Sequence, residues 1–197
     1  MWVKICGLTT AESVADAIDA GADAVGFVFA ESVRAVSIEQ AILLAGIARG
    51  HAEVIAVMKH PSAALAAEVQ ARVQPDRVQT DTADFETLRL LPGILGTPVY
   101  RDSSAIDANN LPPRFLYEGD VSGSGTVANW QRARSLASAG ELILAGGLSP
   151  ANVGGAIEAV QPFGVDVSSG VEAAPGVKDA ALIREFVRVA KAADTAY

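Results

Sequence analysis

Short apolar runs that end in turn residues and lead into helical patterns recur about eight times along the 197 residues of the chain. Residues 3–7, Val-Lys-Ile-Cys-Gly, form the first run, after which Thr9 or Thr10 is placed to cap a helix. Residues 142–145, Leu-Ile-Leu-Ala, form the clearest one. Parallel strands that alternate with helices in this number are typical of a (β/α)8 TIM barrel, and the length lies near the ~200-residue lower limit of that fold. We therefore expect one compact (β/α)8 TIM barrel with shortened loops.

The remaining elements follow the same alternation. Further strands are expected at residues 23–29, 54–58, 77–79, 97–100, 114–117 and 163–167. Helices are expected at residues 38–49, 61–73, 84–91, 130–139 and 179–193, with Ser37 capping the first of these and Ser149-Pro150 capping one more. The stretch 102–113 is rich in turn-forming residues and leaves little room for a full helix. Because no linker or internal repeat interrupts the pattern, residues 1–197 are expected to form a single catalytic domain.

Composition narrows the possible partners. Half of the residues are apolar, which suits a sizeable core, while the net charge of −8 argues against nucleic acid and anionic membrane surfaces. The sequence has no apolar run near the ~20 residues of a membrane span and no secretory pattern, so we expect a cytoplasmic protein. A single cysteine excludes a disulfide framework and a Cys-rich zinc site, and His51 and His60 are expected to be surface or loop histidines. We expect no bound metal.

Two glycine-rich turns follow neighbouring strands late in the chain. Ala145-Gly146-Gly147 comes after the seventh strand and Ser168-Ser169-Gly170 after the eighth. Glycine lets the backbone approach a ligand, and backbone N–H groups at helix N-termini bind an anion without lysine or arginine. In TIM barrels this position commonly binds phosphate. Either turn alone could simply lead a strand into a helix, but the two turns together favour a small phosphorylated ligand.

Several longer motifs together resemble one family, the phosphoribosylanthranilate isomerases of tryptophan biosynthesis. The matches span almost the whole chain in the family's order. They are Val3-Lys4-Ile5-Cys6-Gly7, Gly26-Phe27-Val28-Phe29 followed by Arg34, residues 145–153 (Ala-Gly-Gly-Leu-Ser-Pro-Ala-Asn-Val), Asp166-Val167-Ser168-Ser169-Gly170-Val171-Glu172, and Pro175-Gly176-Val177-Lys178-Asp179.

The resemblance implies an Amadori rearrangement that needs one general acid and one general base but no cofactor. The acid protonates the ribose ring oxygen as the ring opens, and the base removes the proton from C2′. By resemblance, Cys6 is the base and Arg34 pairs with the anthranilate carboxylate. Gly147, Ser168, Ser169 and Gly170 are phosphate-binding positions, and Gly146 belongs to the same turn. Asp166 faces this end either as a substrate contact or as a structural hydrogen-bonding group.

The general acid is the point at which the sequence departs from the family. The family usually ends its sixth strand with Leu-Leu-Asp, whereas this chain reads Leu116-Tyr117-Glu118-Gly119-Asp120, followed by a shorter glycine-serine loop at residues 122–125. Strand register favours Glu118 as the acid, and Asp120 is the alternative. The family's Gln-Leu-His-Gly after the fourth strand is also replaced, by Gln79-Thr80-Asp81-Thr82, which weakens any role inferred for that loop from the family.

A thiol base at neutral pH needs a lowered pKa, since a free cysteine titrates near ~8.5. Lys4 or nearby backbone N–H groups are the candidates for this shift.

Two other functions remain open at this point. A related sugar-phosphate isomerase of histidine biosynthesis would share the phosphate end, but such enzymes have an aspartate in place of Cys6, are longer and show two similar half-barrels. A phosphate-binding barrel without catalysis would need neither Cys6 nor Arg34. The sequence is compatible with a monomer or a homodimer.

Overall fold

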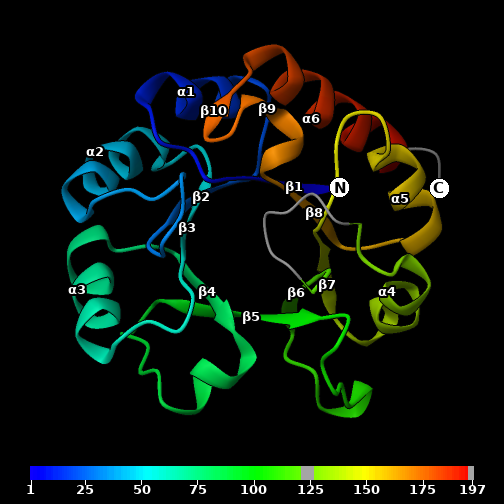
Figure 1. Cartoon of the computed structure of the whole chain (residues 1–197), viewed down its shortest axis with the longest axis horizontal. Helices are drawn as coiled ribbons and strands as arrows, with labels where there is room; N and C mark the ends of the chain where they lie inside the picture. Colours follow the sequence, from blue (N-terminus) through cyan, green and yellow to red (C-terminus); the bar gives the residue numbers. More distant parts are fainter. Residues whose placement is uncertain (121–126, 195–197) are drawn as a thin grey trace.

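Within residues 1–120 and 127–194, which a computed structural model describes, eight parallel strands close into a barrel (Figure 1). Each strand pairs with its neighbours in chain order, and β8 pairs with β1 to complete the circle. The strands are β1 (Trp2–Cys6), β2 (Ala24–Val28), β3 (Glu53–Val57), β4 (Arg77–Asp81), β5 (Leu95–Arg101), β6 (Arg114–Glu118), β7 (Glu141–Leu144) and β8 (Gly164–Val167). The predicted (β/α)8 barrel is confirmed.

The α-helices of the described residues lie around the strands (Figure 1). They are α1 (Ala11–Asp19), α2 (Ile38–Ala48), α3 (Ala63–Val73), α4 (Trp130–Leu136), α5 (Val153–Val160) and α6 (Ala180–Asp194). Thr10 caps α1 through a reciprocal pair of hydrogen bonds with Ser13, and Ser37 caps α2, as predicted. Among these helices none has the length and apolar character needed to cross a membrane.

The connections on either side of β5 differ from the pattern of the other units. The prediction of a helix at 84–91 is wrong, because the chain forms only the 3-10 turn η1 (Thr82–Glu86) there. Asp84 accepts hydrogen bonds from the hydroxyl of Thr80 and from the backbone N–H of His60, so its carboxylate is committed to contacts outside this stretch. The stretch 102–113 has only the 3-10 turn η2 (Ala108–Asn110), as expected. The weak strand predicted at 97–100 extends over seven residues as β5.

Two features near the C-terminal strands also differ from expectation. Helix α5 begins at Val153 with Asn152 at its N-cap position, so the prediction that Ser149-Pro150 caps it is wrong. The Asn152 side chain instead bridges the backbone of Gly147 and Ser149, which holds the loop in place. After β8 and the 3-10 turn η4 (Ser169–Val171), the chain forms an unpredicted antiparallel hairpin of β9 (Glu172–Ala174) and β10 (Val177–Lys178).

The barrel interior has an apolar middle and a charged lower end. Val99, Leu116, Ile143 and Ala145, from adjacent strands or their ends, form a buried cluster inside the barrel. Below it, the Arg114 side chain contacts the carboxylates of Glu53 and Glu141 and lies over the ring of Phe163, 4.7 Å from its centroid. The lower end is therefore filled by side chains. The opposite end, where the strands terminate, holds the pocket described below.

Truncation of the interior cluster is expected to destabilise the barrel. Leu116 is 1% exposed, so Leu116→Ala should lower the free energy of unfolding by about 2–5 kcal/mol. The matched control is Leu43→Ala on α2, where the side chain is 73% exposed and the expected change is within about 0.5 kcal/mol. Urea unfolding measures both values, and similar losses in the two variants would contradict the assignment of Leu116 to the core.

Candidate active site

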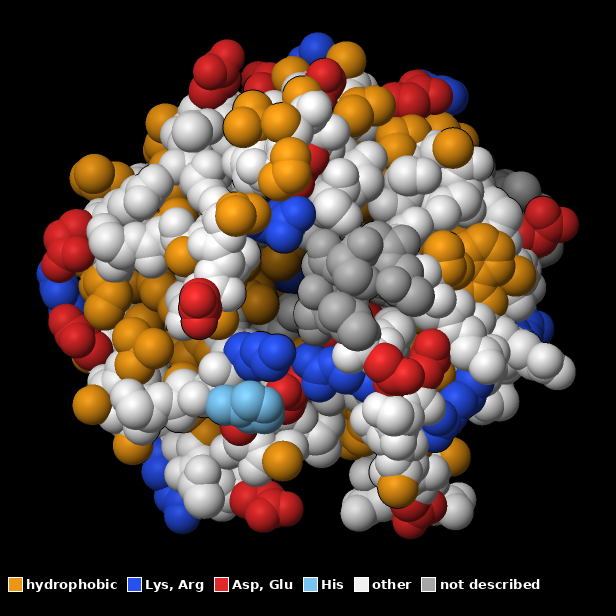
Figure 2. All heavy atoms as spheres, in the orientation of Figure 1, with side chains coloured by type: hydrophobic (Ala, Val, Ile, Leu, Met, Phe, Trp, Pro, Cys, Tyr) orange, Lys and Arg blue, Asp and Glu red, His pale blue; other side chains and the backbone are white. Residues whose placement is uncertain are grey.

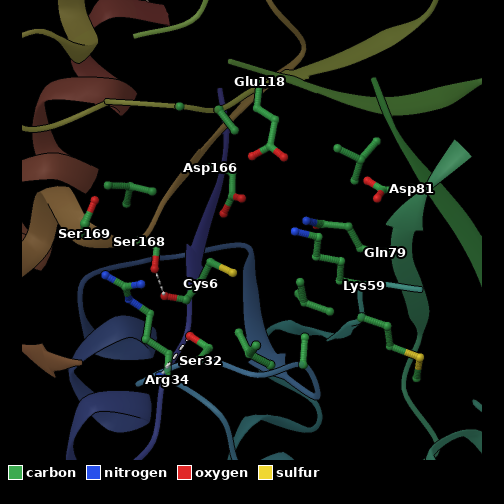
Figure 3. Close-up of a pocket in the computed structure, with 18 of the residues that line it drawn as sticks. Cys6, Ser32, Arg34, Lys59, Gln79, Asp81, Glu118, Asp166, Ser168 and Ser169 are labelled. Carbon is green, nitrogen blue, oxygen red and sulfur yellow. Dashed lines mark hydrogen bonds between the residues drawn. The ribbon is translucent and has the colours of Figure 1, made fainter. Parts of the chain in front are cut away.

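A cavity of about 240 Å³ opens at the carboxyl ends of the strands. Figure 2 shows the hollow on this face of the molecule, with basic side chains gathered beside it. The predicted site residues that line the cavity are Cys6, Arg34, Glu118, Gly146, Gly147, Asp166, Ser168 and Ser169. In Figure 3 the side chains of Cys6, Glu118 and Asp166 all point into it. The barrel thus brings together residues that lie more than a hundred positions apart in the sequence.

Cys6 and Lys4 project from the same face of β1 because side chains alternate along a strand. Lys4 Nζ lies 3.0 Å from Asp166 Oδ2 on β8, and the register places these two residues side by side. Gly26 on β2 leaves room for this arrangement, since a Cβ there would lie 2.9 Å from Lys4 Cε and 3.0 Å from Cys6 Sγ. The second oxygen of Asp166, Oδ1, is buried and has no hydrogen-bond partner among the described residues.

The groups around Cys6 shift the pKa of its thiol in opposite directions. Burial raises the pKa of the Cys6 thiol, Asp166 raises it further, and the positive charges of Lys4 and Lys178 lower it. The net result is a pKa above the ordinary value for cysteine. Burial also disfavours the charged form of Lys4, but Asp166 and Cys6 outweigh this and leave the pKa of Lys4 raised. Lys4 therefore acts on Cys6 in the expected direction, but its charge does not overcome the cost of burying a thiolate.

The turns after β7 and β8 are joined to this centre by hydrogen bonds. Ser168 Oγ donates to the carbonyl oxygen of Cys6 at 3.1 Å, and Lys178 Nζ donates to the carbonyl oxygen of Ser168 at 2.9 Å. Gly170 does not line the cavity but packs on the neighbouring turn, where a Cβ would lie 1.9 Å from the carbonyl oxygen of Leu148. Gly170 therefore allows the two glycine-rich turns to approach each other closely.

Arg34 is held by a carboxylate that the sequence reasoning assigned no role. Its Nε and Nη2 donate to the two oxygens of Glu172 at 2.7 and 2.9 Å, and Lys178 Nζ donates to Glu172 at 2.7 Å. Burial would raise the pKa of Glu172, but the hydrogen bonds from Arg34 and Lys178 lower it to about 2. Burial lowers the pKa of Lys178, which Glu172 opposes. The hairpin β9–β10 supplies both partners and so orients Arg34 at the rim.

The two candidates for the general acid occupy different environments. Glu118, the last residue of β6, lines the cavity, and one of its carboxylate oxygens lies 3.3 Å from Arg101 Nη2. Asp120 is exposed, does not line the cavity, and accepts a hydrogen bond from the backbone N–H of Ser103 at 2.7 Å. The glycine-serine loop at residues 122–125 lies outside the described residues. The structure therefore places Glu118, rather than Asp120, in the cavity with Cys6.

Six polar residues line the cavity in addition to those predicted, namely Glu31, Ser32, Lys59, Gln79, Asp81 and Arg101. Gln79 and Asp81 alternate on β4, and Arg101 ends β5, so strand periodicity could have indicated that these three residues face the cavity.

His60 is exposed, as expected, and its two ring nitrogens contact Asp81 and Asp84. Within the described chain these three residues are the group whose ligand atoms lie close enough to hold a metal ion. Each ring nitrogen contacts a different carboxylate, so the histidine links Asp81 to Asp84.

A closed (β/α)8 barrel with a thiol, carboxylates and paired glycine-rich turns at one mouth places the chain in the class of TIM-barrel enzymes. Residues 3–189 match the family model of N-(5′-phosphoribosyl)anthranilate isomerase. The chain belongs to this family.

Similar proteins extend over nearly the same length. The N-(5′-phosphoribosyl)anthranilate isomerase of Mesorhizobium japonicum is 37% identical over 209 aligned positions, which cover 97% of this chain and 95% of that protein. The crystal structure of the Thermotoga maritima isomerase superposes with a TM-score of 0.85 at 31% identity, covering 98% and 99% of the two chains. A phosphoribosyl anthranilate isomerase crystallised with reduced 1-(o-carboxyphenylamino)-1-deoxyribulose 5-phosphate gives a TM-score of 0.83, also at 31% identity, with 98% and 99% covered.

Removal of the Lys4 charge is expected to make Cys6 harder to ionise. In Lys4→Met the rate of alkylation of Cys6 by iodoacetamide should reach half its maximum at a higher pH than in the wild type, because Lys4 favours the thiolate. Lys191→Met, which removes a lysine paired with Asp23 away from the cavity, is the matched control and should leave the midpoint unchanged. A midpoint in Lys4→Met equal to or below the wild-type value would contradict the assignment.

Proposed function

We propose that this chain converts N-(5′-phosphoribosyl)anthranilate to 1-(2-carboxyphenylamino)-1-deoxyribulose 5-phosphate by the Amadori rearrangement of tryptophan biosynthesis. Family membership supports the reaction, and the related structure with the reduced product supports the ligand. The observation that carries the proposal is that Cys6 on β1 and Glu118 on β6 line one cavity with the turns after β7 and β8.

The proposed chemistry uses one proton donor and one proton acceptor. The protonated Glu118 carboxyl group donates to the ribose ring oxygen as the C1′–O bond breaks, and the anilino nitrogen supplies the electron pair that forms an iminium ion. The Cys6 thiolate then takes the C2′ proton, and the C–H electrons form an enaminol that rearranges to the ketone. Because one proton is given and one is taken, the overall step needs no redox partner or cofactor.

The positive charge of the iminium ion opposes the burial that raises the pKa of Cys6. A positive charge on the ligand nitrogen favours a thiolate nearby, in the same direction as Lys4 and Lys178. The iminium charge therefore favours the thiolate at the stage at which the base is needed. Deprotonation at C2′ is also easier next to an iminium carbon than in the closed ring.

Both ends of the ligand have anion-binding groups in the cavity. We assign the phosphate to the backbone amides of Gly146, Gly147, Ser168 and Ser169 and to the hydroxyl of Ser169. Arg34 is assigned to the anthranilate carboxylate, since Nε and Nη2 contact Glu172 while Nη1 has no hydrogen bond to the described residues. Asp166 serves both roles considered for it, because one oxygen contacts Lys4 and the other is available to a ribose hydroxyl.

The cellular context follows from this assignment. We propose a small phosphorylated molecule as the partner and a biosynthetic role in the cytoplasm. We propose that residues 1–197 work as one catalytic domain, in a monomer or a homodimer.

Steady-state turnover of N-(5′-phosphoribosyl)anthranilate tests the roles directly. Cys6→Ala and Glu118→Gln should each lower kcat by about 10²–10⁴-fold, the usual contribution of general acid–base catalysis. Asp120→Asn is the matched control and should stay within about twofold of wild type, because surface changes outside the site have small effects.

Two results would overturn these assignments. A large loss in Asp120→Asn with nearly normal Glu118→Gln would move the acid to Asp120. A wild-type protein that binds the product but shows no turnover would instead be a binding barrel without catalysis.

A further inference from the structure

Three charged side chains form a row across the ends of three adjacent strands. Arg101 on β5 lies in register with Glu118 on β6, and its Nη2 is 3.3 Å from Glu118 Oε1. The other terminal nitrogen of Arg101, Nη1, contacts Asp81 Oδ1 on β4. All three side chains line the cavity and are largely buried, with exposed fractions of 12% for Asp81, 20% for Arg101 and 12% for Glu118. One guanidinium group therefore links β4 to β6.

Asp81 is itself fixed from its other side. His60 Nε2 lies 3.1 Å from Asp81 Oδ2, and His60 Nδ1 lies 2.9 Å from Asp84 Oδ1. The two oxygens of Asp81 thus face different partners, Arg101 inside the cavity and His60 at its rim. This arrangement limits the orientations open to the Asp81 carboxylate, and through it those open to the Arg101 guanidinium.

A long side chain that delivers a proton must be held in one orientation. Glutamate has several rotatable bonds and loses substantial rotamer freedom when it is fixed, and catalysis by a bound group falls steeply when the group is displaced. A planar guanidinium that is anchored on one side can direct a carboxyl group on the other. Asp81 supplies a counter-charge to Arg101 on the side opposite Glu118, so the guanidinium is held between two carboxyl groups.

We propose that Arg101, anchored by Asp81, is a positioning residue that fixes the carboxyl group of Glu118 above the cavity. This inference rests on the proposed function, in which Glu118 donates the proton to the ribose ring oxygen. Arg101 acts through Glu118 rather than by binding either anionic end of the substrate.

A double-mutant cycle separates positioning from other roles. In the wild-type background, Arg101→Met should lower kcat by about tenfold or more with KM changed by less than about threefold, because the acid is displaced while both anion sites are intact. In a Glu118→Asp background, whose shorter side chain withdraws from Arg101, the same substitution should change kcat by less than about twofold. Arg101→Lys retains the charge without the planar fork and should fall between wild type and Arg101→Met.

A second variant tests the role of Asp81 as the anchor, and a control variant tests whether the effect is specific to the cavity. Asp81→Asn should lower kcat in the wild-type background but add little to Arg101→Met, because both changes release the same carboxyl group. Arg72→Met on α3 removes an arginine that contacts Glu39 and Glu68 away from the cavity, and it should leave kcat and KM unchanged. Thermal unfolding of each variant identifies any loss of folded protein.

Each alternative outcome overturns the inference. The same loss of kcat from Arg101→Met in both backgrounds would show that Arg101 acts independently of Glu118. A rise in KM with unchanged kcat would make Arg101 a substrate ligand. Absence of turnover by the wild-type protein would instead count against the proposed function itself.

Discussion

The pairing of β1 with β8 is the constraint on which the site depends. It closes the barrel and places Lys4 beside Asp166 in the interior, where a charge without a partner would be costly. Because side chains alternate along β1, Cys6 then lies one step closer to the mouth, above this pair. The next residues after β8 form the serine turn that hydrogen-bonds to the backbone of Cys6. The proposed base and the proposed phosphate site are therefore fixed by the same closure.

Charge compensation continues around the rim. Two arginines at the mouth are each held by carboxylates, Arg34 by Glu172 and Arg101 by Asp81 and Glu118. The Arg34–Glu172 pair lets an acidic protein present a cation to an anionic ligand at a defined position, while the carboxylates around Arg101 hold it for a positioning role. The same pairs constrain side chains that would otherwise have many rotamers, so the site is largely ordered before a ligand arrives.

The sequence carried enough information for the barrel and for most residues of the cavity. Strand and helix periodicity predicted the architecture, and parallel strands bring their carboxyl ends to one mouth, so Cys6, Arg34 and Ser168 could be expected together. The preference for Glu118 over Asp120 followed from its position at the end of an apolar strand, and only Glu118 of the two lines the cavity. These inferences rest on local patterns that tertiary contacts reinforce.

The features that were missed depend on contacts between distant segments. The helix expected at 84–91 is replaced by η1, where Asp84 accepts a hydrogen bond from the backbone of the distant His60. The Glu172–Lys178 pair requires a short hairpin that periodicity does not reveal. Arg101 could not be linked to Glu118 without the register of β5, which the sequence marks only weakly.

A crystal structure of the protein with reduced 1-(o-carboxyphenylamino)-1-deoxyribulose 5-phosphate tests the central claim most directly. The account predicts the phosphate at the turns after β7 and β8, with Cys6 beside C2′ and Glu118 facing the oxygen of the former ring. A ligand whose C2′ lies away from Cys6, or whose oxygen meets Asp120 instead of Glu118, would contradict it.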